Sequence, residues 1–199
     1  MAQQDPKAQQ VLDDMSKKYK ELPAYKVNFV NKMENRVENI SEQYSGEITV
    51  KGEKFKLILG DQEVYNNGET VWTYFKDVNE VNIDDFEQGE GELTPVTIYN
   101  AYRDGYKYRF VEEKKEGARS LNVIELQPEQ GSRQFEDLMK IKLEIDKVDN
   151  TLSFMEIYDK SGSVFSYKMS GFNPQSSLSD SVFEFNESKH PGVEVVDLR

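Results

Sequence analysis

The chain has 199 residues, enough for one folded domain that buries a hydrophobic core without disulfide bonds. Acidic residues outnumber basic ones by 37 to 25, which gives a formal net charge of −12. An acidic surface repels phosphate backbones, so nucleic acid is not an expected partner. No apolar run approaches the roughly 18 residues of a membrane-spanning helix. Cysteine is absent, which excludes thiol catalysis and cysteine-rich zinc sites.

The N-terminal segment predicts an amphipathic helix. Asp5 provides an N-cap, Pro6 occupies the first turn, and Pro23 ends the helix. Its apolar residues recur three and four positions apart and form one stripe, which consists of Ala8, Val11, Leu12, Met15 and Tyr19. No signal segment precedes the helix, so we expect either a cytosolic protein or a periplasmic one whose leader is missing from this sequence.

From Tyr25 onward the apolar period changes to two, which is the period of β-strands. The predicted strands cover residues 25–29, 40–44, 46–50, 55–59, 64–65, 71–75, 106–111, 121–126, 141–145, 152–158, 164–169, 183–185 and 193–195. Short turns such as Asn67-Gly68 join them, which favours an antiparallel meander with one covered face. A curved sheet of this size tends to coil into a barrel or half-barrel.

A second helix is predicted within this run of strands. Thr94 is its expected N-cap, Pro95 its first residue and Tyr102 its last. An isolated apolar helix needs a surface to cover, so we expect it to lie over the concave face of the sheet as a lid. The acidic, glycine-bearing loop before it should let the segment 87–102 move when a ligand enters.

The expected fold is mainly β, a single domain over residues 1–199. It is an unclosed half-barrel of antiparallel strands, with the N-terminal and central helices over its concave face. Its aromatic residues, eleven Tyr, eleven Phe and one Trp, either pack this interior solidly or line an apolar cavity. The predicted cavity residues are Leu12, Met15, Tyr19, Phe29, Phe55, Leu57, Leu59, Trp72, Val96, Ile98 and Tyr99. A register slip would turn Val71 inward in place of Trp72.

Catalytic patterns are weak throughout the chain. His190 is the only histidine and stands beside a Pro-Gly turn, where a surface position is the simpler interpretation. The serines of residues 176–181 lack a nucleophile elbow and a base. The acidic loop 84–92 does not match an EF-hand and is more simply interpreted as solvated. We therefore expect no enzymatic activity, no metal and no cofactor.

Several motifs together resemble one known family. In chain order they are Asp5-Pro6, Tyr25-x-Val27-x-Phe29, Gly46-x-Ile48-x-Val50-Lys51, Phe55-x-Leu57, Asn67-Gly68-x-x-Val71-Trp72-x-Tyr74, Leu93-Thr94-Pro95, Phe183-x-Phe185 and Pro191-Gly192-Val193-x-Val195. In this order and spacing the chain resembles the outer-membrane lipoprotein carriers of the LolA type. The Asn-Gly-x-x-Val-Trp-x-Tyr piece is the most specific of the set.

The resemblance implies a monomeric periplasmic carrier with a helical lid. Such a carrier takes lipid-modified lipoproteins from an inner-membrane ABC-type release complex, holds their acyl chains, and passes them to an outer-membrane acceptor. The alternative is a non-catalytic periplasmic sensor or interaction domain of the same fold with a filled core. One departure concerns the lid: Lys51-Gly52-Glu53 stand where the better-known branch has an Arg-Pro pair that latches it. Lid closure here would then rest on apolar contact alone.

Overall fold

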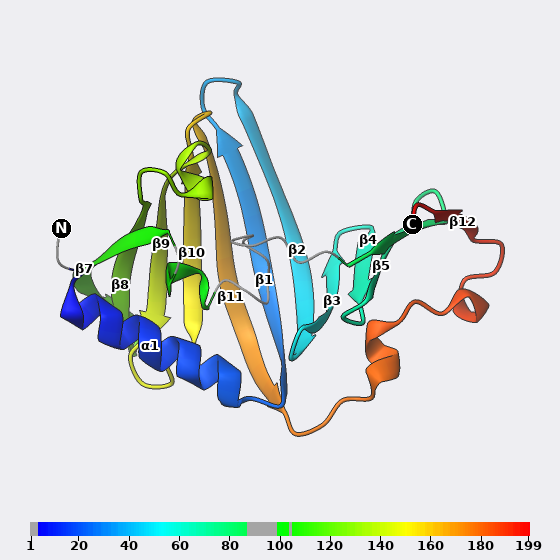
Figure 1. The fold of residues 1–199 in the computed structure, drawn as a ribbon, viewed down its shortest axis with the longest axis horizontal. Helices are drawn as coiled ribbons and strands as arrows, with labels where there is room; N and C mark the ends of the chain where they lie inside the picture. Colours follow the sequence, from blue (N-terminus) through cyan, green and yellow to red (C-terminus); the bar gives the residue numbers. More distant parts are fainter. Residues whose placement is uncertain (1–3, 87–98, 104) are drawn as a thin grey trace. The chain divides into compact units, whose positions relative to one another are not determined.

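The computed structural model describes residues 4–86, 99–103 and 105–199 (Figure 1). Its helices and strands are, in chain order, α1 (Pro6–Glu21), β1 (Ala24–Asn35), β2 (Ile40–Lys51), β3 (Lys54–Leu59), β4 (Gln62–Asn66), β5 (Thr70–Phe75), β6 (Glu80–Asp85), the 3-10 helix η1 (Ala101–Arg103), β7 (Tyr106–Glu116), β8 (Arg119–Pro128), η2 (Arg133–Phe135), β9 (Leu138–Asp146), β10 (Leu152–Asp159), β11 (Ser163–Gln175), η3 (Asp180–Phe183), η4 (Glu187–Lys189) and β12 (Glu194–Asp197). Among the described helices, none is long and apolar enough to cross a membrane.

The strands form one sheet in the order β12-β6-β5-β4-β3-β2-β1-β11-β10-β9-β8-β7. The pairs from β6 to β2 and from β11 to β7 are antiparallel, and β12 pairs with β6 in parallel. The order ends in two different edge strands, so the sheet is unclosed. The predicted mainly β, unclosed antiparallel fold is confirmed.

Two details of the sequence prediction were wrong. Strand β6 was missed because its acidic residues are typical of a loop, although Val81 and Ile83 alternate and are both buried. The expected strand 183–185 is instead the end of η3 and the residues after it. The strand predicted at 193–195 exists as β12, but a long connection returns it to β6 in the parallel direction.

The described residues group into two compact units. Of the described residues, unit 1 comprises 4–21, 30–43, 99–103 and 105–170, and unit 2 comprises 22–29, 44–86 and 171–199. Strands β1, β2 and β11 each contribute residues to both units. That the whole chain is one domain remains a prediction.

In unit 1, helix α1 packs on strands β7 to β10 (Figure 1). The helix begins as predicted, because Asp5 Oδ1 accepts hydrogen bonds from the backbone N–H groups of Lys7 and Ala8 at 2.9 and 3.3 Å. Its buried stripe faces side chains that the strand register places on one face of the sheet. These residues are Tyr106, Ile124, Leu126, Ile141, Leu143, Ile145, Leu152 and Met155.

The residues before α1 cover part of the free edge of β7. The Gln4 side chain donates to the Tyr106 carbonyl at 3.0 Å and accepts from the Tyr108 N–H at 3.1 Å. Asp5 Oδ2 accepts from the Phe110 N–H at 2.8 Å. Unpaired N–H and C=O groups on an edge strand invite pairing with other chains, so these side chains protect that edge.

The opposite face of this sheet carries ion pairs around buried carboxylates. Glu144 is held by Lys114 at 2.8 Å and by Lys142 at 3.1 Å. Burial alone would raise the pKa of Glu144, but these two lysines outweigh it and lower that pKa. The sheet of unit 1 therefore has one apolar face under α1 and one charged face.

In unit 2, the register assigns each side chain to one of two faces. Directly paired residues in an antiparallel sheet point to the same side. The face that contains Leu57, called the Leu57 face below, comprises Ile48, Val50, Phe55, Leu57, Leu59, Gln62, Val64, Asn66, Val71, Thr73, Phe75, Glu80, Asn82 and Asp84. The opposite face, called the Trp72 face, comprises Glu47, Thr49, Lys56, Ile58, Glu63, Tyr65, Trp72, Tyr74, Val81 and Ile83.

The C-terminal segment covers part of the Trp72 face. Figure 1 follows this segment from orange to red after β11. The Phe185 ring packs on Tyr65 and Tyr74, with centroid distances of 5.8 and 5.2 Å. The His190 ring lies 4.4 Å from the Tyr74 ring and 4.6 Å from that of Phe185. The only histidine is thus partly buried in an aromatic cluster, which gives it a packing role.

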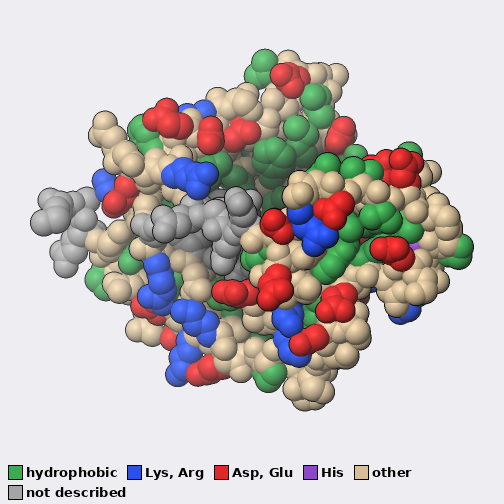
Figure 2. All heavy atoms as spheres, turned by 45° about the vertical axis from the view of Figure 1, so that its right-hand side comes forward, with side chains coloured by type: hydrophobic (Ala, Val, Ile, Leu, Met, Phe, Trp, Pro, Cys, Tyr) green, Lys and Arg blue, Asp and Glu red, His purple; other side chains and the backbone are tan. Residues whose placement is uncertain are grey.

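Acidic side chains outnumber basic ones in this protein, which gives the net charge of −12. Figure 2 shows them dispersed over the visible face, with fewer basic side chains between them and apolar groups in the gaps. Such a surface keeps a protein soluble and disfavours adsorption to anionic membranes.

Glu63 is the centre of an ion network on the Trp72 face, and its replacement should change how the free energy of unfolding depends on pH. It contacts Lys76 at 2.8 Å and Lys56 at 3.2 Å and accepts a hydrogen bond from the Tyr65 hydroxyl. Burial alone would raise its pKa, but these partners lower the pKa of Glu63 from 4.5 to about 2. A carboxyl whose pKa is lowered by folding stabilises the protein above its unfolded pKa, and this stabilisation is lost as the pH falls towards 2.

Replacement Glu63→Gln should therefore lower the free energy of unfolding at pH 7 by about 1–2 kcal/mol. It should also flatten the decline in stability between pH 4.5 and 2. Urea denaturation at several pH values measures both effects. Glu47→Gln is the control, because Glu47 forms a more exposed pair with Lys26 at 3.4 Å. Equal effects of the two replacements would contradict the assignment.

Candidate functional site

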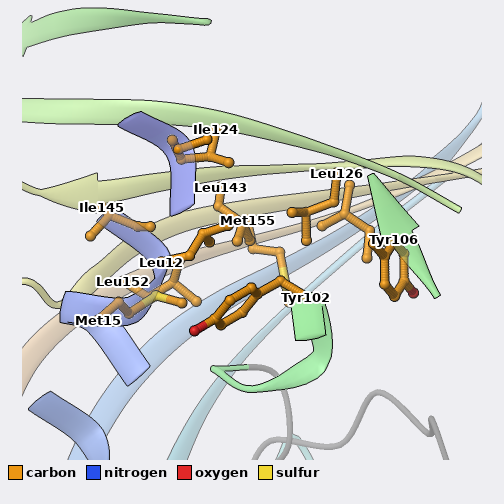
Figure 3. Close-up of a cluster of buried hydrophobic side chains, with 12 residues drawn as sticks. Leu12, Met15, Tyr102, Tyr106, Ile124, Leu126, Leu143, Ile145, Leu152 and Met155 are labelled. Atoms are coloured by element: carbon orange, nitrogen blue, oxygen red, sulfur yellow. The ribbon is translucent and has the colours of Figure 1, made fainter. Parts of the chain in front are cut away.

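The predicted site residues of α1 lie in the core of unit 1. Leu12 and Met15 have 0% exposed surface and pack on β8, β9 and β10 (Figure 3). A side chain that borders a space wide enough for water keeps some accessible surface there. These two side chains keep none, so in this state they are packed core residues. Their role in ligand binding remains a prediction that would require α1 to shift.

Tyr19 and Tyr99 are the other predicted site residues in unit 1. Their rings stack at a centroid distance of 5.4 Å, and both pack beside the buried cluster. The Tyr19 hydroxyl oxygen accepts a hydrogen bond from the Leu152 N–H at 3.1 Å. Burial raises the pKa of Tyr19 to about 12, so its phenol stays neutral at physiological pH. The pair supplies an apolar surface with no charge.

The described end of the expected lid is held by polar contacts. Ser16 donates to Asn100 Oδ1 at 2.6 Å, and Tyr102 donates to Asp13 at 2.6 Å. Arg103 also pairs with Asp13, at 2.7 Å. The expectation that this segment depends on apolar contact alone is therefore wrong at this end, because α1 presents two polar side chains to it.

The structure describes only the last residues of the helix that was expected from Thr94 to Tyr102. Residues 99 and 100 form a turn, and Ala101 to Arg103 form the 3-10 helix η1. The predicted cavity residues Val96 and Ile98, with the rest of the predicted lid, lie outside the described residues. The lid itself therefore stays a prediction.

Four predicted site residues lie together in unit 2. Phe55, Leu57 and Leu59 alternate along β3 on the Leu57 face. Phe29 joins them, because a side-chain carbon placed at Gly46 would meet the Phe29 ring at 2.5 Å and the Ile58 carbonyl oxygen at 2.6 Å. Gly46 pairs with Leu59, so a side chain at position 46 would point to the Leu57 face. The Phe29 ring therefore lies on this face, in space that a larger residue at position 46 would fill. Leu57 and Leu59 are only partly buried and keep accessible apolar surface.

Trp72 does not belong to this group. It pairs with Tyr65, which pairs with Lys56, and this places the indole on the Trp72 face. The position on β5 that shares the Leu57 face belongs to Val71, which pairs with Asn66. Placing Trp72 with Phe55 and Leu57 was wrong by one residue of register, and the alternative with Val71 inward is what the pairing gives.

Lys51, the first residue of the Lys51-Gly52-Glu53 segment that stands where the resemblance implies an Arg-Pro pair, contacts the C-terminal segment. Its ammonium lies 2.7 Å from Asp180 Oδ1 and donates to the Leu178 carbonyl at 2.8 Å. Lys54 contacts the other oxygen of Asp180 at 2.9 Å. Hydrogen bonds from the two lysines lower the pKa of Asp180 to about 2. The turn between β2 and β3 thus anchors the C-terminal segment of unit 2.

Within the residues that the structure describes, no group of three or more His, Cys, Asp or Glu side chains could hold a metal ion. The features that remain are the partly exposed apolar side chains of the Leu57 face and two buried amide atoms on that face, Nδ2 of the fully buried Asn66 and Oδ1 of the half-buried Asn82. Sequence analysis missed these asparagines, because Asn66 adjoins a predicted turn and Asn82 lies in the missed strand β6.

Comparison with known proteins identifies the family. The family model described as "Outer membrane lipoprotein carrier protein LolA" matches residues 1–139. The chain belongs to this family. A curated relative, the "Outer-membrane lipoprotein carrier protein" of Legionella pneumophila (strain Lens), is 28% identical over 137 residues. These residues make up 68% of this chain and 63% of the relative, so the match spans less than two thirds of that protein.

Solved structures share the fold at low sequence identity. An uncharacterized conserved protein from Thermus thermophilus superposes with a TM-score of 0.63 at 15% identity, covering 96% of this chain and 99% of the other. The Pseudomonas aeruginosa MucA/MucB complex gives a TM-score of 0.52 at 15% identity, covering 90% of this chain and 61% of the matched chain. At such identities the likeness concerns the fold alone.

Proposed function

We propose that this protein is a periplasmic carrier that binds the acyl chains of lipoproteins and shuttles them from the inner to the outer membrane. The observation that carries the proposal is the match of residues 1–139 to the lipoprotein carrier family. Its partners would be an inner-membrane ABC-type release complex and an outer-membrane acceptor. The protein would act as a monomer and by binding, without catalysis.

The Leu57 face of unit 2 supports this proposal physically. Its apolar side chains on β2 and β3 adjoin one another in register, and Leu57 and Leu59 keep accessible surface. Burying an acyl chain gains about 0.8 kcal/mol per CH₂, so a continuous apolar strip is the chemistry a carrier needs. The acidic exterior would keep the loaded carrier in solution between its two membranes.

The rival function is a periplasmic sensor or interaction domain with a filled core. The complete burial of Leu12 and Met15 in unit 1 favours it, since a packed helix leaves no room for a ligand there. The two functions differ in one measurable property. A carrier binds acyl chains in a defined ratio, whereas an interaction domain with a filled core does not.

Two neighbouring residues of β3 provide a matched test. Leu57 lies on the Leu57 face and Ile58 on the Trp72 face, and both are partly buried. Replacement Leu57→Gln should weaken binding of a fluorescent palmitoyl probe about tenfold, because the amide must be desolvated against the acyl chain. Ile58→Gln should change binding less than about twofold, since its side chain points away.

Purification with a palmitoylated lipoprotein, followed by mass spectrometry, should recover that lipoprotein with the unaltered protein and lose most of it with Leu57→Gln. No binding of either the probe or the lipoprotein to the unaltered protein would reject the carrier function. Equal losses for Leu57→Gln and Ile58→Gln would show that the acyl chain does not lie on the Leu57 face.

A further inference from the structure

The Leu57 face changes character from strand to strand. Its residues on β2 and β3 are apolar: Ile48, Val50, Phe55, Leu57 and Leu59. Across β4, β5 and β6 the polar residues Asn66, Thr73, Asn82 and Asp84 join the face. On these strands the polar residues lie beside Val64, Val71 and Phe75. The face therefore has an apolar part on β2 and β3 and a mixed polar and apolar part on β4 to β6, and a ligand matched to it would itself be amphipathic.

Two buried polar atoms on this face lack partners. The Asn66 side chain has 0% exposure, and its Oδ1 accepts a hydrogen bond from the Gly68 N–H at 2.6 Å. This bond fixes the other amide atom as nitrogen. Among the described residues, neither Asn66 Nδ2 nor Asn82 Oδ1 has a hydrogen-bond partner. The face thus holds one free donor and one free acceptor.

Buried amide groups are almost always paired, because an unpaired one loses its hydration without compensation. Two such atoms on one face, beside an apolar strip, are therefore a cost that a ligand could remove. Because Asn66 is fully enclosed, the side chains that cover it must move aside before a ligand reaches its amide. Asn66 on β4 pairs with Val71 of β5, and Asn82 on β6 pairs with Thr73 of β5. The two asparagines therefore lie on opposite sides of β5, at positions two residues apart along that strand. From strand spacing and rise, their Cα atoms are about 12 Å apart, so they would meet different groups of one ligand.

We infer that Asn66 and Asn82 form a polar subsite for the linkage region of an acylated protein N-terminus. Asn66 Nδ2 donates to an ester carbonyl of the lipid anchor, and Asn82 Oδ1 accepts from an amide N–H of the attached peptide. The acyl chains extend from this subsite over Phe55 and Leu57 towards β2. The inference rests on the proposed carrier function and adds which part of the lipoprotein is recognised.

The chemistry of the two atoms selects this ligand class over a free fatty acid. An acyl chain attached to a protein ends in an ester or amide, which offers a neutral carbonyl acceptor and, in the peptide, N–H donors. A fatty acid ends in a carboxylate, which only accepts hydrogen bonds and would lie near the carboxylate of Asp84, on the same face. The subsite therefore favours anchored over free acyl chains.

Ligand chemistry supplies the first test, on the unaltered protein. Two synthetic lipopeptides would be compared, one whose N-terminal cysteine carries two ester-linked palmitoyl chains and one with the same chains in ether linkage. The ether analogue lacks the carbonyl oxygens. We expect the ester lipopeptide to bind about tenfold more tightly, because one additional hydrogen bond worth about 1.4 kcal/mol changes the dissociation constant tenfold. Equal affinities would overturn the inference.

Two variants then assign the contacts. Asn66→Leu, of similar volume but without a donor, should reduce the ester preference to within about twofold while the ether lipopeptide still binds. Asn82→Leu should weaken the lipopeptide severalfold but leave palmitate at least as tightly bound. An ester preference that persists in Asn66→Leu would overturn the role of Asn66. If the unaltered protein bound neither lipopeptide nor palmitate, the carrier function itself would fail, whereas binding of both without ester preference would remove the subsite alone.

Discussion

Replacing Phe183 by alanine should lower the free energy of unfolding by about 3–5 kcal/mol. Phe183 has 0% exposed surface and heads the fully buried side chains ranked by volume. It ends η3, which packs against β3. Truncation removes apolar contacts and leaves a cavity, and both effects add to the loss. Urea denaturation followed by tryptophan fluorescence measures the change, because Trp72 belongs to the same unit.

Glu184→Ala is the matched control for Phe183→Ala. Glu184 is the next residue and is exposed, so its replacement should change the free energy of unfolding by less than about 0.5 kcal/mol. A loss below about 1 kcal/mol for Phe183→Ala would contradict the packing described here. It would mean that the C-terminal segment separates from β3 at little cost, although Lys51 and Lys54 both contact Asp180.

Replacing Leu12 by alanine should lower the free energy of unfolding by about 2–5 kcal/mol, the range for a fully packed leucine. Leu12 belongs to the cluster in which α1 packs on the sheet of unit 1 (Figure 3). If Leu12 instead lined an open cavity, solvent would already touch it, and its truncation would cost much less. The measurement therefore decides between a packed residue and a cavity-lining residue.

Lys17→Ala is the control on the same helix. The Lys17 side chain is 71% exposed and forms an ion pair with Glu21 at 3.8 Å. Alanine has the higher helix propensity, so this replacement should change stability by less than about 0.5 kcal/mol. Comparable losses for Leu12→Ala and Lys17→Ala would show that α1 contributes through helix formation rather than through packing.

The sequence predicted the regular elements well wherever the pattern was local. The α1 boundaries followed from Asp5, Pro6 and Pro23, because capping and proline chemistry act within a single turn. Period-two alternation located most strands. It failed at β6, where acidic residues occupy several positions of the strand, and at 183–185, where two phenylalanines pack without forming a strand.

The candidate site was harder to predict, because the face of a side chain depends on register. Phe55, Leu57 and Leu59 were grouped correctly, since they alternate within one strand. Trp72 was placed on their face, although the pairing of β4 with β5 puts it on the other. A shift by one residue reverses every side chain of a strand, and no local pattern in β5 fixes that choice.

The sequence by itself determined the mainly β class, the N-terminal helix and the lipoprotein carrier family, because propensity, periodicity and motif order can be read from neighbouring residues without knowledge of the tertiary structure. Only the tertiary structure decided which side chains meet. It packed Leu12 and Met15 into a closed core, paired Lys51 with Asp180 across the sequence, and left Asn66 Nδ2 and Asn82 Oδ1 buried among the described residues without partners. The physical reason is that burial and hydrogen-bond satisfaction depend on long-range pairing between strands, which the local sequence constrains only to within one residue.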